Sequence, residues 1–486
     1  MRHSLVTHQV LSHLRHTLHA VLHCAPITAG ALLVASVGCS SGDDEKKPGT
    51  GPGSPAADWR MLGYDTMSTF WNRGETRITR DTARGLVKAW EFDTTSGVSA
   101  TPVVSGGKVY VVTGLQGVIA LDLATGSELY RNPDISGNPS PTLDGGILYV
   151  HANNGTIYAL SPDDLHVIWS FPTDDQANLV GFSSPVVTKD FVIVGGSTLE
   201  ELLIPSGGPQ FRGFITAVRK DGTFGWKIYT VEPGAHGATL WSTVSVDEES
   251  GIVVGSTSNN HGPPATDTSD AFLAVPLQDG ASFLWKSQIF QGDVWNVQNF
   301  GSPDNDFGAN PILFELDGRK VAAGANKGGD IWVVDRLTGE VLRQRNIGGR
   351  GAATGGVFVN GAWDGTSLLV ACNNTTSTGP GSETSGPAAT LFSINPSTLD
   401  INWERQVTGL VFSWITVANG AGFFAKDKTL QAFDTATGEV LFEFPTEGTI
   451  STAPAISNGY VVFGSGMSWP SAGATPGTKY YALKVP

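Results

Sequence analysis

The sequence predicts an all-β protein, an eight-bladed β-propeller built from four-stranded antiparallel blades. The 486-residue chain contains 61 glycines and 27 prolines, which suits many short strands joined by tight turns. A unit of four short apolar strands separated by turn residues recurs along the chain, as expected for propeller blades. Large side chains end the units, about 40 residues apart in the short units, at Trp90, Tyr130, Trp169, Trp226, Trp285, Leu342, Trp403 and Phe442.

The first unit shows how its strands and turns are recognised. Its opening stretch, 99–104, is followed by a Gly-Gly turn and by the apolar strand 108–112. A later turn, 122–126, has the pattern Asp-x-x-Thr-Gly, and this pattern recurs at 335–339 and 434–438. Glycine supplies the positive φ that a tight turn between antiparallel strands requires. Each copy of the pattern therefore indicates a hairpin inside a blade.

The two ends of the repeat region predict how the ring closes. The last unit, 453–483, has no terminal aromatic strand, whereas 86–92 is an aromatic strand without a blade of its own. Pairing these two segments would complete the last blade and hide two sheet edges. We therefore expect one propeller domain over 58–486, in which an N-terminal strand closes the last blade.

The N-terminus resembles a bacterial export signal of the lipoprotein type. The apolar run 27–37 is too short to span a bilayer, and small residues precede Cys39. This pattern predicts a signal peptide over 1–38, lipidation of Cys39, and a flexible Gly/Pro-rich tether over 39–57. Secretion after cleavage by a conventional peptidase is the alternative. Either route places the protein outside the cytoplasm, in the periplasm or at the outer membrane, with a lipid anchor as its one membrane attachment.

Charge and cysteine content exclude several classes of function. The net charge is −15, and residues 1–38 contain two arginines and no acid, so their removal gives −15 − 2 = −17. A chain this acidic is not expected to bind nucleic acid. The cysteines are Cys24, Cys39 and Cys372, so a processed, lipidated chain has no internal disulfide. The absence of a Cys-x-x-Cys-His motif excludes a covalently attached haem c on this chain.

Long insertions between the strands contain the residues that could form a site. A propeller scaffold does not require them, and loops on a rigid frame are where sites are usually built. They contain the motifs Thr-Leu-Glu-Glu at 198–201, Phe-Arg-Gly at 211–213, Leu-Trp-Ser at 240–242, Thr-Ser-Asn-Asn at 257–260, Gly-Asp-Val-Trp-Asn at 292–296, Asp-Phe-Gly at 306–308, and the segment around Lys327.

These seven motifs, in this order, resemble the quinoprotein dehydrogenases, and most closely their polyvinyl alcohol dehydrogenase-like branch. The resemblance extends from about Trp59 to Pro486. It implies an eight-bladed propeller that holds pyrroloquinoline quinone and a calcium ion near its axis. It also implies oxidation of an alcohol, including secondary or polymeric alcohols, with electrons passed to a separate carrier such as a periplasmic cytochrome c.

The resemblance assigns the metal and catalytic positions. Glu200, Asn259 and Asp306 match the side-chain calcium ligands, and calcium prefers several oxygen ligands of this kind. The cation would act as a Lewis acid on the quinone. Asp306 also matches the general base that takes the alcohol proton.

The resemblance also assigns positions around the cofactor ring. Trp241 matches the indole on which a flat heterocycle stacks. Lys327 matches the cation that meets the quinone oxygens and stabilises the reduced form. Thr239, Arg212 and Asn373 could hydrogen-bond the carboxylates or rim of the cofactor.

Each assignment has a structural alternative. Trp241 could be one of many core tryptophans, Asn259 a turn residue, Glu200 a solvated acid, Asp306 a turn cap and Lys327 a surface lysine. The chain also lacks the adjacent Cys-Cys of many alcohol-oxidising members, and it has Ser258 where the family motif has glycine. A propeller without cofactor, acting as a binding or assembly scaffold in the cell envelope, is therefore the second hypothesis. The enzyme requires Glu200, Asn259 and Asp306 to converge near the axis, and the scaffold does not.

Overall fold

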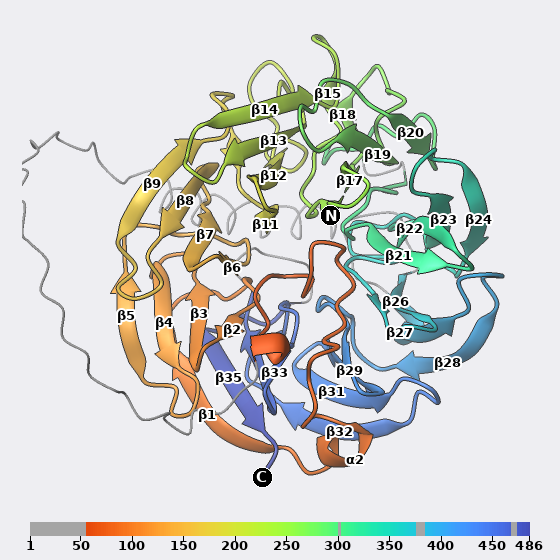
Figure 1. Cartoon of the computed structure of the whole chain (residues 1–486). Helices are drawn as coiled ribbons and strands as arrows, with labels where there is room; N and C mark the ends of the chain where they lie inside the picture. The colour runs from red at the N-terminus through yellow and green to blue at the C-terminus, as the bar shows by residue number, and fades with distance from the viewer. Residues whose placement is uncertain (1–54, 300–302, 376–383, 468–473) are drawn as a thin grey trace, which may run out of the picture.

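The computed structural model describes residues 55–299, 303–375, 384–467 and 474–486. It confirms an all-β protein in which eight four-stranded antiparallel blades surround a central axis (Figure 1). The expected signal segment 1–38, the expected lipidation site Cys39 and most of the tether lie outside the described residues. No helix in the described part of the chain has the length and apolar character needed to cross a membrane.

The first four blades follow the chain in order. Blade 1 contains β2 (Val103–Ser105), β3 (Lys108–Val112), β4 (Val118–Asp122) and β5 (Glu128–Asn132). Blade 2 contains β6 (Thr142–Asp144), β7 (Ile147–His151), β8 (Thr156–Leu160) and β9 (Val167–Pro172). Blade 3 contains β11 (Val186–Val187), β12 (Phe191–Thr198), β13 (Phe214–Arg219) and β14 (Phe224–Tyr229), with the additional strand β10 (Leu179–Val180) on β12. Blade 4 contains β16 (Ser245–Asp247), β17 (Ile252–Ser256), β19 (Ala271–Pro276) and β20 (Trp285–Gln288).

The remaining blades complete the ring. Blade 5 contains β21 (Ile312–Leu316), β22 (Arg319–Ala325), β23 (Asp330–Asp335) and β24 (Val341–Asn346). Blade 6 contains β25 (Ala362–Trp363), β26 (Leu368–Thr375), β27 (Thr384–Ile394) and β28 (Ile401–Val407). Blade 7 contains β29 (Thr416–Ala418), β30 (Ala421–Lys426), β31 (Thr429–Asp434) and β32 (Val440–Pro445). Blade 8 contains β33 (Ala455–Ser457), β34 (Tyr460–Ser465), β35 (Lys479–Lys484) and β1 (Val87–Asp93). Outside the blades lie η1 (Pro55–Ala57), α2 (Arg80–Ala83) and the pair β15 (His236–Gly237) and β18 (Asn260–Gly262).

The closure predicted from the sequence is confirmed. Strand β1 pairs antiparallel with β35, and Trp90 lies opposite Ala482. Inner strands such as β12 and β34 are buried along their whole length, whereas the outermost strand β9 has only exposed and half-buried side chains. This difference explains why the inner strands are continuous apolar runs.

The tryptophans that end the units pack against the next blade. Trp90 donates its indole N–H to the Leu123 carbonyl at 2.8 Å, and a Cβ on Gly126 would lie 2.6 Å from the Trp90 ring. Glycine in the Asp-x-x-Thr-Gly turn is therefore required by its positive φ of 73° and by this close approach. Trp169, Trp226, Trp285 and Trp403 make the equivalent hydrogen bond to Lys220, Leu277, Arg336 and Thr435.

Side-chain oxygens link neighbouring blades near the axis. The backbone N–H of Thr101 donates to the Ser140 hydroxyl at 2.8 Å, and the N–H of Ser140 donates to the Ser184 hydroxyl at 2.9 Å. The N–H of Ala453 donates to the Thr101 hydroxyl at 2.8 Å, which joins blade 8 to blade 1. We call these hydrogen bonds the inner belt, which also includes the bonds of Ser184 to Thr243, Thr243 to Asn310 and Asn310 to Asn360.

Thr101→Val is expected to destabilise the ring by about 1–3 kcal/mol, because it leaves the buried N–H of Ala453 without an acceptor. The measurement is the free energy of unfolding from chemical denaturation. Thr101→Ser retains the oxygen and should unfold close to the wild-type protein. Equal stability of the valine and serine variants would contradict a role for the inner belt.

The chain before β1 crosses one end of the central channel. Trp59 exchanges backbone hydrogen bonds with Val104 in β2, at 2.9 and 2.8 Å. Backbone carbonyls further along the segment accept hydrogen bonds from backbone N–H groups in the innermost strands of five other blades. The donors are Leu143, Val246, Leu313, Trp363 and Val417. In Figure 1 this orange-red segment runs across the centre of the ring. We call 59–72 the floor segment, because it covers one end of the channel.

Candidate active site

A cavity of about 230 Å³ lies near the axis of the propeller. Aromatic side chains line much of it, including those of Trp241, Trp295, Phe358 and Trp414. Leu62 of the floor segment also contributes to its wall. Three charged side chains, those of Glu201, Asp304 and Lys327, are among the lining residues and set the electrostatics of the cavity.

A buried lysine between two carboxylates borders the cavity, and Lys327 and Asp304 line its wall. Lys327 lies in the turn between β22 and β23, and Asp304 and Asp306 precede β21. The Lys327 Nζ lies 2.7 Å from the Asp306 Oδ1 and 3.1 Å from the Asp304 Oδ2. The three side chains are at most 8% exposed, so solvent screens this ion pair weakly.

The electrostatics of this triad keep Asp306 ionised. Burial alone would raise the pKa of Asp306, but the Lys327 ammonium and the hydrogen bonds that Asp306 accepts lower it below its ordinary value. Burial and the neighbouring Asp306 raise the pKa of Asp304 well above its ordinary value. The pKa of Lys327 is raised despite burial, because both carboxylates favour its charged form. The site therefore holds one protonatable acid beside an ionised one.

Trp241 connects this triad to the aromatic wall. Its Nε1 donates a hydrogen bond to the Asp306 Oδ2 at 2.8 Å. Its ring lies 5.7 Å from the Phe358 ring, and the Lys327 Nζ lies 5.4 Å from its centroid. A Cβ on Gly308 would come within 2.2 Å of the indole, so glycine in the Asp-Phe-Gly motif makes room for Trp241.

Asn259 has a buried oxygen without a partner. Its Nδ2 donates to the carbonyls of Asn260 and Trp295 at 2.8 and 2.9 Å, which fixes the amide orientation. Its Oδ1 is buried and accepts no hydrogen bond. Such an oxygen is costly to bury unless a donor or a cation meets it.

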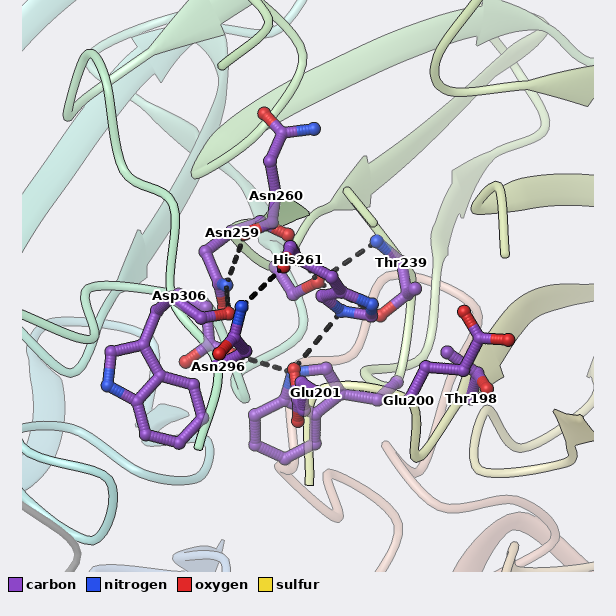
Figure 2. A network of polar contacts seen from close by, with 12 residues as sticks. Thr198, Glu200, Glu201, Thr239, Asn259, Asn260, His261, Asn296 and Asp306 are labelled. Atoms are coloured by element: carbon purple, nitrogen blue, oxygen red, sulfur yellow. Dashed lines mark hydrogen bonds and ion pairs between the residues drawn. The ribbon is translucent and has the colours of Figure 1, made fainter. Parts of the chain in front are cut away.

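The two neighbouring glutamates after β12 differ in orientation. The Glu200 carboxylate accepts hydrogen bonds from Asn178, Gln210 and Phe211 within its own blade. Figure 2 shows Glu200 pointing away from Asn259 and Asp306, whereas Glu201 points toward His261. Glu201 lines the cavity, and Glu200 is not part of its wall.

The other expected cofactor residues lie away from the cavity wall. Arg212 donates twice to the Val231 carbonyl and stacks 4.1 Å from the centroid of the Tyr229 ring. Asn373 joins blades 6 and 7 through hydrogen bonds to Thr354 and Val411. The buried hydroxyls of Thr239 and Ser258 share a hydrogen bond of 2.9 Å. The structure therefore brings Asp306, Trp241 and Lys327 together, and it engages Arg212, Asn373 and Thr239 elsewhere.

Several site residues have no sequence assignment. Glu201 is within the motif 198–201, and Asp304 lies two residues before the motif 306–308. Asp270 is fully buried with no hydrogen-bond partner for its carboxylate, and burial together with Asp293 raises its pKa. Burial raises the pKa of Asp293 to about 6. Among the described residues, no three His, Cys, Asp or Glu side chains are grouped closely enough to hold a metal by themselves.

Comparison with known proteins places this chain in a family. The family profile described as outer membrane protein assembly factor BamB, named PQQ_2, matches residues 81–293 and 327–471, which is more than half of the chain. The chain belongs to the PQQ_2 family. The predicted resemblance to quinoprotein dehydrogenases, including their polyvinyl alcohol dehydrogenase-like branch, is confirmed by curated relatives of that kind.

Two such relatives are dehydrogenases. Quinohemoprotein alcohol dehydrogenase ADH IIB of Pseudomonas putida is 27% identical over 330 residues, covering 56% of this chain and 45% of that protein. Polyvinylalcohol dehydrogenase of Sphingopyxis sp. (strain 113P3) is 25% identical over 410 residues, covering 74% of this chain and 62% of that protein. The chain thus spans about half to two thirds of the length of these relatives.

Solved structures support the fold. Quinohemoprotein alcohol dehydrogenase from Comamonas testosteroni superposes with a TM-score of 0.72 at 21% identity, covering 89% of this chain and 81% of that one. A europium-containing methanol dehydrogenase superposes with a TM-score of 0.70 at 17% identity, covering 88% of this chain and 98% of that one. At these identities the likeness concerns the fold alone.

Proposed function

We propose that this PQQ_2 propeller oxidises an alcohol, with pyrroloquinoline quinone as the bound oxidant and a calcium ion beside it. One observation carries the proposal. Asp306, a buried carboxylate held ionised by Lys327, accepts a hydrogen bond from Trp241, and both Trp241 and Lys327 line an aromatic cavity. A scaffold gains nothing from burying this group, because buried ion pairs contribute little net stability. A general base beside an aromatic cavity fits oxidation of a hydroxyl group.

The residues present fit both implied groups. The unpartnered Oδ1 of Asn259 and the carboxylates nearby are the oxygen ligands that calcium prefers. Trp241 and Phe358 offer apolar surface to a flat ring, and Lys327 offers an ammonium to anionic oxygens. Lys327 and Trp241 would therefore hold the quinone, and Asn259 and Asp306 would hold the cation.

In this proposal each side chain of the site has a separate role in the oxidation. When bound, the quinone supplies the acceptor for the hydride that leaves the carbinol carbon. Asp306 accepts the hydroxyl proton on its carboxylate, so the alcohol becomes a carbonyl compound by loss of one proton and one hydride. Trp241 orients Asp306 through its indole N–H. Lys327 keeps Asp306 unprotonated between turnovers.

The proposal also covers the substrate, the electron acceptor and the location of the protein in the cell. The curated relatives include a polyvinylalcohol dehydrogenase and a protein named 1-butanol dehydrogenase (cytochrome c). These names support an alcohol substrate, including secondary or polymeric alcohols, and a separate cytochrome c as electron acceptor. We further propose export and lipidation at Cys39, with the propeller in the cell envelope.

Reconstitution of the purified protein tests the proposal. Quinone and calcium are added, unbound quinone is removed by gel filtration, and dye reduction is followed with primary, secondary and polymeric alcohols. We expect one quinone retained per chain and calcium-dependent dye reduction. Failure to retain the quinone would contradict the enzyme and favour the assembly scaffold that the family description names.

A further inference from the structure

The residues of the inner belt occupy one fixed position in every blade. Each lies two positions before the innermost strand of its blade, as Thr101 does before β2 and Ser140 before β6. The same position is held by Trp414 before β29 in blade 7 and by Ala453 before β33 in blade 8. None of these eight belt residues is charged, and Trp414 is the one aromatic residue among them. The belt level of the central channel is therefore neutral, with an indole contributed by blade 7.

Five belt side chains line the end of the cavity that lies next to the floor segment. The Nδ2 of Asn310 donates to the hydroxyl of Ser68 in the floor segment at 3.4 Å, and Leu62 of that segment also lines the cavity. The three charged residues of the cavity wall are not belt residues. We call this end of the cavity the belt chamber, which is lined by Leu62, Ser140, Ser184, Thr243, Asn310 and Trp414.

The belt chamber has hydrogen-bond donors that are not in use. The hydroxyl oxygens of Ser140, Ser184 and Thr243 each accept a backbone N–H from the neighbouring blade. None of these three hydroxyls donates a hydrogen bond within the described part of the chain. The Nε1 of Trp414 is buried without a hydrogen-bond partner, and its ring packs against the cluster that contains Phe412. An indole N–H donates and does not accept, so the partner that suits this chamber is an acceptor.

We infer that the belt chamber binds the carbonyl oxygen of a small neutral molecule, a ketone or an aldehyde. A carbonyl oxygen has two lone pairs and no hydrogen, so it accepts from a hydroxyl and from Trp414 without requiring an acceptor in return. An alcohol of the same skeleton brings a hydroxyl hydrogen that needs its own partner. A carboxylate brings a charge that the neutral belt does not compensate.

This site requires neither the quinone nor the cation, so it is separate from the triad of Lys327, Asp304 and Asp306. The carbonyl compound formed in the proposed oxidation belongs to the same chemical class. Only this match with the reaction product rests on the proposed function.

NMR of the indole N–H groups in the full chain without quinone tests the inference. The signal of Trp414 in protein with isotope-labelled tryptophan is assigned by its loss in Trp414→Phe. Butanone is expected to shift this signal downfield to saturation, because its oxygen accepts from the indole N–H. Propionate and sec-butanol are of similar size and should bind roughly tenfold more weakly, the equivalent of about one hydrogen bond.

Two tryptophan variants provide a matched comparison, with butanone binding followed by saturation-transfer NMR of its methyl groups. Trp414→Phe keeps an aromatic ring and removes the N–H, so butanone binding should weaken roughly fivefold, while the melting temperature stays close to that of the wild type. Trp403→Phe removes an indole N–H that donates to the Thr435 carbonyl in the next blade. This control should melt at a lower temperature and bind butanone as the wild type does.

The outcomes separate this inference from the proposed function. A Trp414 signal that does not respond to butanone, or that responds equally to sec-butanol, would overturn the inference and leave water as the partner of these donors. Equal butanone binding by the wild type and Trp414→Phe would also overturn it. Because no quinone is present, these results leave the proposed function standing, and failure of the chain to retain quinone leaves this inference standing.

Discussion

Asp306→Asn is expected to lower kcat for alcohol oxidation roughly 10³-fold, because a neutral amide does not accept the hydroxyl proton. The substitution keeps the shape of the side chain and leaves an oxygen that can accept from Trp241. Quinone retention should therefore persist while turnover is lost. The measurement is dye reduction by the reconstituted protein at saturating alcohol, alongside quinone content per chain.

The pH profile adds a second readout for Asp306. Because Lys327 holds the pKa of Asp306 below its ordinary value, the base remains ionised under mildly acidic conditions. Wild-type activity should therefore fall on acidification only below the usual range of aspartate titration. Comparable turnover by the asparagine variant and the wild type would show that another group takes the proton.

Lys327→Met is expected to destabilise the protein by about 3–5 kcal/mol, because it leaves Asp304 and Asp306 buried without their cation. The free energy of unfolding in denaturant measures the loss. Adding Asp304→Asn to Lys327→Met should recover part of it, because this second change removes one of the two unpaired acids.

Lys88→Met provides a control for removal of a lysine from an ion pair. Lys88 is about half exposed and pairs with Glu91 on the surface, so its loss should cost about 0–1 kcal/mol. Similar losses for the Lys327 and Lys88 variants would contradict the expectation that Lys327 compensates two buried carboxylates. Quinone retention by Lys327→Met should also fall, because the ammonium beside Trp241 is gone.

The sequence predicts the blades because each depends on short-range patterns. The turn glycine and the tryptophan that packs against it in the next blade are both visible as repeats, as for Gly126 and Trp90. The ring closure also follows from the sequence, since one blade lacks a strand and one strand lacks a blade. These features are local in sequence or recur at regular spacing.

The orientation of site residues in irregular loops is not predictable in the same way. Strand β12 ends at Thr198, so the alternation of faces no longer applies at Glu200 and Glu201. Which carboxylate faces the cavity is set by contacts with residues distant in sequence, Asn178 for Glu200 and His261 for Glu201. The same holds for Arg212, whose contacts with Val231 and Tyr229 follow from packing that no motif indicates.

The floor segment and β1 make the order of chain synthesis matter. Carbonyls near the start of the described chain accept from strands as late as β29, and β1 completes its sheet only against β35. The amino-terminal portion must therefore remain undocked until the last residues have emerged from the ribosome or crossed a membrane. Removal of β35 by truncation from the C-terminus would leave an open sheet edge at β1, and an open edge promotes aggregation with other chains.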